Sequence, residues 1–468
     1  MKSKSRRIDK GVALLCLCAA ICLAVVLPGL ADATTHYVWT NSPAESSPYT
    51  SWDTAAHNIQ SAVNAAVSND TVCVTNGTYL LSGQIVVTNA VTVISVNGAS
   101  NTIVNGNSGS RCFYISNNHA VVDGFTVTNG NDASSGGGAY IYGGTLLNCI
   151  VAGNSVTTNG QGGGIYMRSE ASMVGNCVIA GNYCNGRNSG WGGGGVSCFA
   201  SGIISNCTIY NNTATVNGDG QYGAGGGGIH LDGGLAYKCT VYSNACYGTA
   251  GASGLSGGGG LGLYNSGGTR TNTVMNSTIY SNTISSASGG GVLTYASSNA
   301  MIYGCLIYGN NGRNGGGICW FHSADIQNCT VVSNRNGGSA SAALYHYGNG
   351  ANGIARMLNM IVYSNQGGTW TYDGTFTNIS LANCDMEVTN FPSGAIVSNC
   401  ITNNPQFVDF DGGNYRLRMT SPCVNTGTNQ SWMTNAVDLD GNARILNGIV
   451  DMGAYETYLW QGTIYRIP

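Results

Sequence analysis

One motif recurs eight times along the chain and limits the folds that the chain can adopt. Each copy has a glycine run, an apolar segment, a second apolar segment that in most copies begins at a Cys, and an Asn five residues later. Residues 315–334 show the motif as GGGICWFHSADIQNCTVVSN. The eight copies, of which the last is degenerate, occupy residues 136–154, 162–182, 193–212, 226–244, 258–282, 289–310, 315–334 and 341–365. A recurring unit at uneven spacing predicts a solenoid whose loops vary in length while its strands do not.

The two apolar segments of each copy alternate apolar and polar residues, which is the period of a β-strand. Two residues after the Cys position, every copy carries a β-branched residue: Val151, Ile179, Ile209, Val241, Ile279, Ile307, Val331 and Val362. Side chains two residues apart share one face of a strand, so both columns are expected to face the interior. The motif therefore predicts an all-β solenoid.

The glycines and the asparagine have separate expected roles. Glycine permits a tight approach of the chain into the next strand. The conserved spacing within the chain places an Asn at the end of every copy: Asn154, Asn182, Asn212, Asn244, Asn282, Asn310, Asn334 and Asn365. Asn tolerates the left-handed turn conformation, and stacked amides can bond from coil to coil. We expect these asparagines to turn the corner of each coil and to form a hydrogen-bonded ladder.

Cysteine is the third element of the motif. Fifteen cysteines follow residue 33, which is an odd number for an oxidising compartment. We expect the column cysteines to be free core thiols, because in-register neighbours on parallel strands point side by side rather than at one another. Cys184 and Cys246 lie outside the column, and a disulfide between them is predicted.

The first 33 residues have the composition of a secretory signal peptide. A basic start, MKSKSRRIDK, precedes an apolar run from Val12 to Leu27 and the small-residue site Ala31-Asp32-Ala33. Cleavage is predicted after Ala33, which leaves an exported chain without a transmembrane domain, secreted or on the outer surface of a bacterial-type cell. The alternative is an uncleaved membrane anchor, since the apolar run is slightly long.

The charge composition argues against a nucleic-acid partner. Charged residues are 8% of the chain, against roughly 25% in an average globular domain. The part after residue 33 holds 12 basic and 18 acidic residues, a net charge of −6, and Lys238 is its only lysine. Such a chain has no electrostatic footprint for nucleic acid, so we predict no nucleic-acid partner. We expect a monomer.

Residues 34–70 precede the repeats and carry a different signal. Ile59, Ala62, Val63 and Ala66 stand at helical spacing, and Ser51 or Asp53 is placed to cap a helix. A strand and a short amphipathic helix are predicted here. The helix would cover the open end of the solenoid, whose terminal coil otherwise exposes unpaired edges.

With these motifs the chain resembles a right-handed parallel β-helix of the pectin-lyase-like superfamily over residues 71–400. The Gly-Gly-Gly-apolar and apolar-x-x-Asn signatures, as in 226–229 and 209–212, also resemble repeats of bacterial polymorphic outer-membrane proteins. Residues 401–457, with Ser421-Pro422-Cys423 and the segments 438–444 and 451–456, are similar to the C-terminal module of choice-of-anchor Q proteins. That resemblance implies surface anchoring, whereas the short tail at 458–468 leaves free secretion open.

The superfamily resemblance makes a polysaccharide lyase, and then a glycoside hydrolase, the enzymes to consider. Both need clustered carboxylates or a basic residue beside them. Between residues 136 and 365 the only carboxylates are Glu170, Asp219, Asp232 and Asp325, in different coils. The best catalytic candidates are Arg168, Glu170, His230 and Asp232, with Arg168 expected to reach Asp232 across one coil. The alternative is an ordinary surface ion pair.

A second candidate is a calcium site near the C-terminus. The stretch Asp438-Leu439-Asp440-Gly441-Asn442, together with Asp409 and Asp411, supplies the oxygen ligands that Ca²⁺ prefers. Calcium is the only cofactor that the sequence indicates. The alternative is that Asp-Gly-Asn serves only as turn chemistry.

Aromatic residues form two columns that strand alternation places outside. Tyr142, Tyr264, Tyr295, Phe321 and Tyr347 follow the glycine runs, whereas Tyr210, Tyr242, Tyr280, Tyr308 and Tyr363 stand three residues after the Cys position. Exposed rings in register can stack on sugar faces, or they can stack on one another and only stabilise the sheet. We predict a protein that binds polysaccharide or a cell-surface glycan, or acts in adhesion, through this face. A carbohydrate-active enzyme and a structural spacer without ligand are the alternatives.

Overall fold

The computed structural model describes residues 33–458 except 187–191, 218–224, 250–256, 266–269, 286–287, 296–298, 338–342, 348–353, 374–378, 388–390 and 392–393. The predicted signal peptide therefore lies outside the described residues, apart from Ala33. Among the described residues, no helix is long and apolar enough to cross a membrane.

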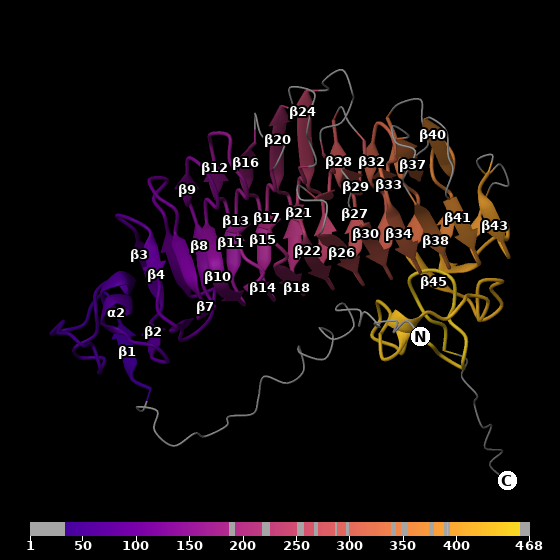
Figure 1. Cartoon of the computed structure of the whole chain (residues 1–468). Coiled ribbons are helices and arrows are strands. Elements are labelled where there is room, and N and C mark those ends of the chain that lie inside the picture. The colour runs from indigo at the N-terminus through magenta and orange to yellow at the C-terminus, as the bar shows by residue number, and fades with distance from the viewer. Residues whose placement is uncertain are drawn as a thin grey trace, which may run out of the picture.

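Three parallel sheets form the body of the molecule (Figure 1). Sheet A contains β1 (Thr35–Val38), β2 (Thr71–Val74), β4 (Ile85–Val87), β5 (Thr92–Ser95), β7 (Phe113–Asp123), β10 (Ala139–Leu147), β13 (Ile165–Met167), β14 (Ser172–Gly175), β17 (Val196–Phe199), β18 (Ile203–Ser205), β21 (Ile229–Asp232), β22 (Gly234–Tyr237), β25 (Leu261–Tyr264), β26 (Thr271–Met275), β29 (Val292–Tyr295), β30 (Asn299–Tyr303), β33 (Ile318–Trp320), β34 (Ala324–Gln327), β37 (Leu344–Tyr347), β38 (Ala355–Leu358), β40 (Trp370–Asp373), β41 (Ile379–Ala382) and β43 (Ile396–Ser398).

The other two sheets have one strand per coil. Sheet B contains β3 (Gly77–Leu80), β6 (Thr102–Asn105), β8 (Thr126–Thr128), β11 (Ile150–Ala152), β15 (Val178–Ala180), β19 (Thr208–Tyr210), β23 (Thr240–Tyr242), β27 (Thr278–Tyr280), β31 (Leu306–Tyr308), β35 (Thr330–Val332), β39 (Ile361–Tyr363) and β42 (Asp385–Met386). Sheet C contains β9 (Asn131–Asp132), β12 (Ser155–Val156), β16 (Tyr183–Asn185), β20 (Thr213–Asn217), β24 (Ala245–Thr249), β28 (Thr283–Ile284), β32 (Asn311–Gly312) and β36 (Arg335–Asn336).

From β9 to β39 each coil of the solenoid runs from sheet C through sheet A to sheet B, and neighbouring coils pair in parallel. In sheet B, for example, Ile179 lies opposite Val151 and Ile209 opposite Ile179. The predicted all-β, right-handed parallel β-helix with a short N-terminal helix is confirmed.

The interior of the solenoid is built from the columns that the repeats predict. The β-branched column is fully buried, and the column cysteines, such as Cys177 and Cys207, are buried free thiols. The predicted disulfide between Cys184 and Cys246 is wrong. Ala214 of β20 lies in register between them, so they stand two strand spacings apart, about 9 to 10 Å, which is beyond the reach of a bridge.

The motif asparagines form the predicted ladder inside the solenoid. Asn212 is typical: its backbone N–H and its Nδ2 both donate to Asn244 Oδ1, at 3.0 and 2.9 Å, while its own Oδ1 accepts two bonds from Asn182. The same pattern runs from Asn154 to Asn365, and these side chains are between 0 and 8% exposed. A buried amide is stable only when its polar atoms are paired, and the ladder pairs them from coil to coil.

The expectation that these asparagines take the left-handed conformation is wrong. The left-handed residue is the one before each ladder position, for example Gly181 before Asn182 and Ser243 before Asn244. A positive φ there turns the chain so that the following amide points into the interior.

The glycine runs belong to the same device. A Cβ on Gly164 would stand 2.9 Å from the amide carbon of Asn182, and one on Gly195 would stand 3.0 Å from Asn212 Nδ2. Only glycine leaves room for the ladder side chain beneath the chain at this point. Each copy of the motif therefore contains both a glycine run and an asparagine because these residues are in contact in the fold.

The helix α2 (Ile59–Ala65) packs against β1, β2 and β4 at the N-terminal end of the solenoid. It buries Ile59, Ala62 and Val63, as the periodicity predicts. Its N-cap is Asn58, whose Oδ1 accepts from the backbone of Ser61 at 2.9 Å. Ser51 bonds to Thr54 instead, so neither predicted cap is used.

The chain after Cys400 turns back along the solenoid (Figure 1, yellow). It contains the antiparallel pair β44 (Phe407–Asp409) and β45 (Asn414–Leu417) and the 3₁₀ helix η2 (Ser431–Met433). Phe407, Tyr415 and Tyr455 pack in one cluster with Leu306 and Ile361 of sheet B. This segment, residues 401–458, is called the C-terminal segment below.

Candidate functional site

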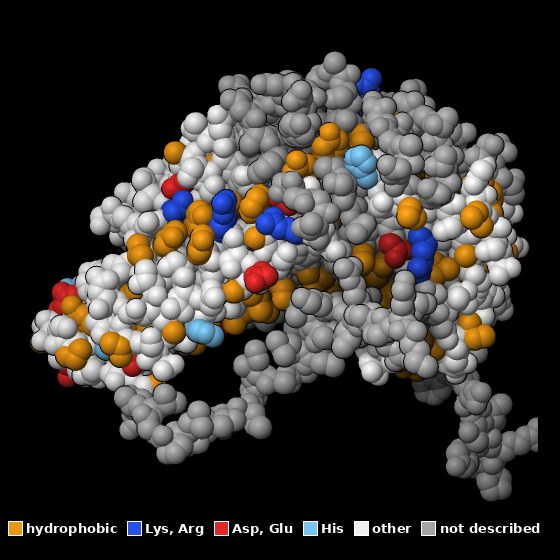
Figure 2. All heavy atoms as spheres, viewed as in Figure 1, with side chains coloured by type: hydrophobic (Ala, Val, Ile, Leu, Met, Phe, Trp, Pro, Cys, Tyr) orange, Lys and Arg blue, Asp and Glu red, His pale blue; other side chains and the backbone are white. Residues whose placement is uncertain are grey.

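The outward face of sheet A, over β10 to β25, carries Arg168, His230 and Asp232 of the predicted catalytic set together with other arginines and aromatic rings. In β21, Ile229 and Leu231 belong to the core, so His230 and Asp232 point to the other face. Figure 2 shows basic side chains in a row on this side, interleaved with hydrophobic ones. We call six of these residues the arginine strip: Arg111, Tyr140, Tyr166, Arg168, Phe199 and Arg270.

Cation–π contacts hold the strip together. The Arg111 guanidinium lies 5.1 Å from the centre of the Tyr140 ring, and the ring centres of Tyr140 and Tyr166 are 5.0 Å apart. Arg111 is also paired with Asp132 at 2.9 Å, so its charge is balanced within the fold. Arg111 is buried, and its guanidinium donates to Gln84, to the backbone oxygens of Ser135 and Gly136 and to Asp132, so it fixes the ring of Tyr140 rather than offering donors to a ligand.

Phe199 is held between two arginines. The guanidinium carbons of Arg168 and Arg270 lie 5.0 and 5.2 Å from the centre of its ring. Arg168 is exposed and donates a hydrogen bond of 2.9 Å to the hydroxyl of Tyr166, which raises the pKa of Arg168. Burial raises the pKa of Tyr166, so its hydroxyl stays protonated. Arg168 thus presents an exposed positive charge, and its guanidinium is held in place by the Tyr166 hydroxyl and the Phe199 ring.

His230 and Asp232 lie beneath the surface and have no solvent exposure. Asp232 is ion-paired with Arg270 at 3.5 Å, and the Nδ1 of His230 is 3.0 Å from the hydroxyl oxygen of Ser197. Burial lowers the pKa of His230 to about 4, although Asp232 acts in the opposite direction. A polysaccharide cannot contact buried side chains. The positions of His230 and Asp232 therefore favour a role in holding Arg270 and its neighbours over a role in acid–base catalysis.

The structure separates the other predicted partners. Arg168 stops at Phe199 in the intervening coil, and the residue that pairs with Asp232 is Arg270, which sequence reasoning missed. Arg270 lies in a part of the sequence whose length differs from copy to copy, so it has no fixed place in the repeat and no periodic signal could have found it. Glu170 is exposed, and within the described residues it forms no ion pair with Arg168.

The burial of His230 predicts a pH-dependent stability. Between pH 6.5 and about 4 the unfolded chain binds a proton at this residue that the folded protein does not. The free energy of unfolding should therefore fall as the pH drops through this window, by up to on the order of 3 kcal/mol from this group. Urea unfolding of the His230→Gln variant should show a shallower decline than the parent protein. The exposed His119→Gln change is the control, and an unaltered slope in His230→Gln would contradict the prediction.

The predicted aromatic column after the glycine runs is only partly open. Tyr142 is 52% exposed, as expected, and Tyr295 is half-buried. Tyr264 and Phe321 are 6% and 5% exposed because they pack with Leu293, Cys319 and Tyr345 in a satellite cluster. The expectation of open rings is therefore wrong for Tyr264 and Phe321. The side chain of Tyr347 lies outside the described residues.

The second aromatic column is a stack of rings. Tyr210, Tyr242, Tyr280 and Tyr308 have successive centres 5.0, 4.8 and 4.9 Å apart and planes within 8° of parallel. Rings stacked in this way use their faces on one another and present their edges outward. The C-terminal segment covers the end of the column, where Tyr415 lies against Tyr308. This geometry favours the alternative in which the column stabilises sheet B.

The predicted calcium ligands are engaged within the protein. Asp438 accepts hydrogen bonds from the backbone of Asp440, Asn442 and Glu456, and Asp440 is paired with Arg416 at 2.5 Å. The described part of the chain contains no group of three or more His, Cys, Asp or Glu side chains placed to hold a metal ion. The stretch therefore forms a turn, as in the alternative, and Asp409 and Asp411 do not join it to make a metal cluster.

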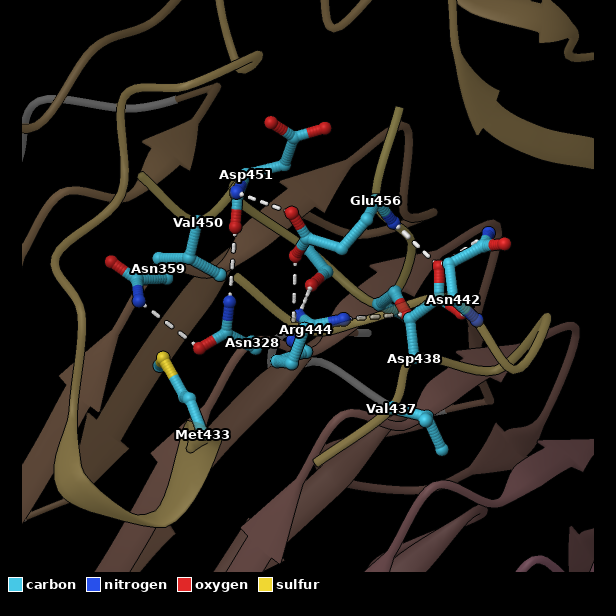
Figure 3. Close-up of polar contacts among 12 residues, drawn as sticks. Asn328, Asn359, Met433, Val437, Asp438, Asn442, Arg444, Val450, Asp451 and Glu456 are labelled. Atoms are coloured by element: carbon cyan, nitrogen blue, oxygen red, sulfur yellow. Dashed lines mark hydrogen bonds and ion pairs between the residues drawn. The ribbon is translucent and has the colours of Figure 1, made fainter. Parts of the chain in front are cut away.

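A buried polar core organises the C-terminal segment instead (Figure 3). Arg444 has no exposure and donates to the carbonyl oxygens of Gly453 and Ala454, and its Nε lies 3.5 Å from Glu456 Oε1. Burial raises the pKa of Glu456 to about 8, against the effect of Arg444. The core is joined to the solenoid by a bond of 3.0 Å from Asn328 to the backbone oxygen of Asp451.

Comparison with known proteins finds similar solved structures but no similar sequence. No family model matches the chain, and no curated protein sequence matches it. Three solved structures share the architecture: pectate lyase Pel9A (15% identity, TM-score 0.48, 92% of this chain and 98% of that one), the A-module of the mannuronan C-5 epimerase AlgE6 from Azotobacter vinelandii (16%, 0.49, 74% and 95%) and a rhamnogalacturonan lyase (12%, 0.40, 89% and 96%). These likenesses concern the β-helix. The resemblances to polymorphic outer-membrane repeats and to a choice-of-anchor Q module stay predictions.

Proposed function

We propose that this protein binds an acidic polysaccharide on the outward face of sheet A, through the arginine strip. The observation that carries the proposal is the pair of arginines around Phe199, with Arg168 exposed and held by Tyr166. Asp132 and Asp232 compensate Arg111 and Arg270, whereas within the described residues Arg168 has no acidic partner. An exposed guanidinium held against an aromatic ring, as Arg168 is, can bind the carboxylate or sulfate groups of a polymer.

Export and glycan binding support one another in this proposal. A signal peptide over residues 1–33 would bring the chain to a compartment where cell-surface and extracellular polysaccharides occur. The long, regular face of the solenoid suits a polymer whose units repeat, because successive coils present groups about 4.8 Å apart. Anchoring at the cell surface or free secretion is compatible with the same binding face.

The test is affinity electrophoresis of the purified protein in gels that contain polygalacturonate, alginate, a sulfated polysaccharide or neutral xylan. We expect retardation by at least one anionic polymer and none by xylan, with an effect that weakens at high salt. Arg168→Gln should lower the affinity about 5-fold to 30-fold, which corresponds to roughly 1 to 2 kcal/mol for one cation in such a site. Arg335→Gln, an equal change at an exposed arginine of sheet C, should leave the affinity unchanged.

Two results would overturn the proposal. Equal retardation of the parent and of Arg168→Gln would move binding away from the strip, and no retardation by any polymer would favour a structural spacer. The polymers are also assayed for new reducing or unsaturated ends after incubation. Cleavage would assign the protein to the carbohydrate-active enzymes and would require a site other than buried His230 and Asp232.

A further inference from the structure

Lys238 occupies a backbone position where the rest of the solenoid uses asparagine or glycine. The residue before the Cys column turns the chain from sheet A into sheet B with a positive φ near +50 to +60°. Its occupants are Asn148, Asn176, Asn206, Lys238, Asn276, Gly304, Asn328, Asn359, Asn383 and Asn399. Asn and Gly tolerate this conformation, whereas a long unbranched side chain gains nothing from it. At φ +52°, Lys238 therefore occupies a backbone position that disfavours lysine relative to asparagine.

The same residue borders a cavity between the solenoid and the C-terminal segment. The cavity has a volume of about 290 Å³ and is lined by Lys238, Thr240, Asn276 and Thr278 on one side and by Leu439 and Asp440 on the other. This volume is just below the range of about 300 to 1,000 Å³ for drug-sized ligands, so only a small molecule would fit. Lys238 is also the only lysine after residue 10, and it is exposed. The one lysine that follows the signal peptide thus stands at the rim of a cavity.

The charges around the cavity favour an anion. Both carboxylate oxygens of Asp440 accept hydrogen bonds from Arg416, at 2.5 and 2.6 Å, so this carboxylate is already balanced. Within the described residues, Lys238 forms no ion pair, and its ammonium lies 5.4 Å from the centre of the Tyr237 ring. Thr240 and Thr278, neighbours in register on β23 and β27, belong to the same lining. One uncompensated cation, two hydroxyls and an apolar wall at Leu439 form a site for a small polar anion.

We propose that this cavity binds a single acidic sugar unit, with its carboxylate at Lys238 and its hydroxyls at Thr240 and Thr278. The site is separate from the arginine strip, because it lies where sheet B meets the C-terminal segment. It therefore does not depend on the function proposed above. The ligand is a uronic acid, either free or as a unit of a chain.

The test compares the affinities of galacturonate and glucuronate with those of galactose and glucose by isothermal titration of the full protein. We expect binding of at least one uronate and at least tenfold weaker binding of the neutral sugars. Lys238→Asn introduces the residue that other coils have at this backbone position, so the melting temperature of the variant should equal or exceed that of the parent protein. The affinity of the variant for the uronate should fall at least tenfold. Asn206→Lys, the equivalent change one coil earlier, is the matched control and should lower the melting temperature without creating a site.

The outcomes separate the two proposals. Arg168→Gln should weaken binding of the polymer and leave the affinity for the free uronate unchanged. Lys238→Asn should weaken binding of the free uronate, while the polymer still retards the protein through the arginine strip. A trimer of the uronate distinguishes the sources of the ligand, since tighter binding than the monomer indicates a unit within a chain. The inference fails if no uronate binds to the parent protein, or if Lys238→Asn keeps its affinity. It also fails if Lys238→Asn lowers the melting temperature, because the lysine would then be explained by stability.

Discussion

Replacing Asn244 by Ala is expected to lower the free energy of unfolding by about 2 to 5 kcal/mol, although the change removes only an amide group. Asn244 Oδ1 accepts two bonds from Asn212, and its Nδ2 donates to the backbone oxygen of Ile209 at 2.9 Å and to Asn282 Oδ1 at 3.0 Å. Alanine leaves the backbone N–H of Asn212 without an acceptor in the interior. Each buried polar group left unpaired costs about 1 to 3 kcal/mol.

Urea unfolding followed by circular dichroism measures this effect. The control is Asn64→Ala on the exposed side of α2, which should change stability by less than about 0.5 kcal/mol. Because coils interact only with their neighbours, the transition of Asn244→Ala should broaden as the solenoid divides near the altered coil. A loss below about 1 kcal/mol would mean that the ladder bonds contribute little beyond what water supplies.

Replacing Arg444 by Met is expected to cost about 3 to 5 kcal/mol and to act on the C-terminal segment rather than on the solenoid. The change leaves Glu456 buried without its cation and removes the donors to Gly453 and Ala454. Burial already raises the pKa of Glu456 to about 8, so this side chain can stay protonated, and most of the cost comes from the two buried carbonyl oxygens left without donors, at about 1 to 3 kcal/mol each. The double change Arg444→Met and Glu456→Leu should recover only a small part of the loss, because the carbonyl oxygens of Gly453 and Ala454 still lack donors and the N–H of Asp451 loses its acceptor on Glu456.

Amide hydrogen exchange gives the readout. In Arg444→Met the amides of β44, β45 and residues 450–457 should exchange faster, while those of the Asn ladder keep their protection. The separation is expected because the contacts that Arg444→Met removes lie within the segment, whereas its hydrogen bonds to Asn328 and Asn359 and its packing on sheet B are left in place. Equal loss of protection in the ladder would show that the segment and the solenoid unfold as one unit.

Much of the fold could be predicted because its information is local and repeated. Spacing within eight copies determines which residues face inward, and the β-branched and Cys columns are buried as predicted. The left-handed position was missed by one residue. The residue that turns is variable, being Gly, Asn or Ser, whereas the invariant Asn is a buried side chain. Within the repeat, invariance marks the position with several partners rather than the position with unusual backbone geometry.

The candidate site was predicted less well because it depends on loops and on segments far apart in the chain. Arg168 was found by its place in the repeat, but Arg270, which has no fixed place in the repeat, was not. The prediction of exposed rings was partly wrong for a similar reason. Alternation indicates which face of the sheet a side chain is on, but not what covers that face. Tyr264 and Phe321 point outward and are nevertheless buried.

The sequence by itself determined the solenoid and its inward columns, because these follow from strand period and repetition. Only the tertiary structure decided where the C-terminal segment lies, that Asp438 and Asp440 serve a turn and an ion pair, and that Lys238 borders a cavity. These features bring together residues up to about two hundred positions apart, as Lys238 and Asp440 show. No local pattern encodes such a contact, because it exists only once the stacked coils offer a surface for the segment to cover.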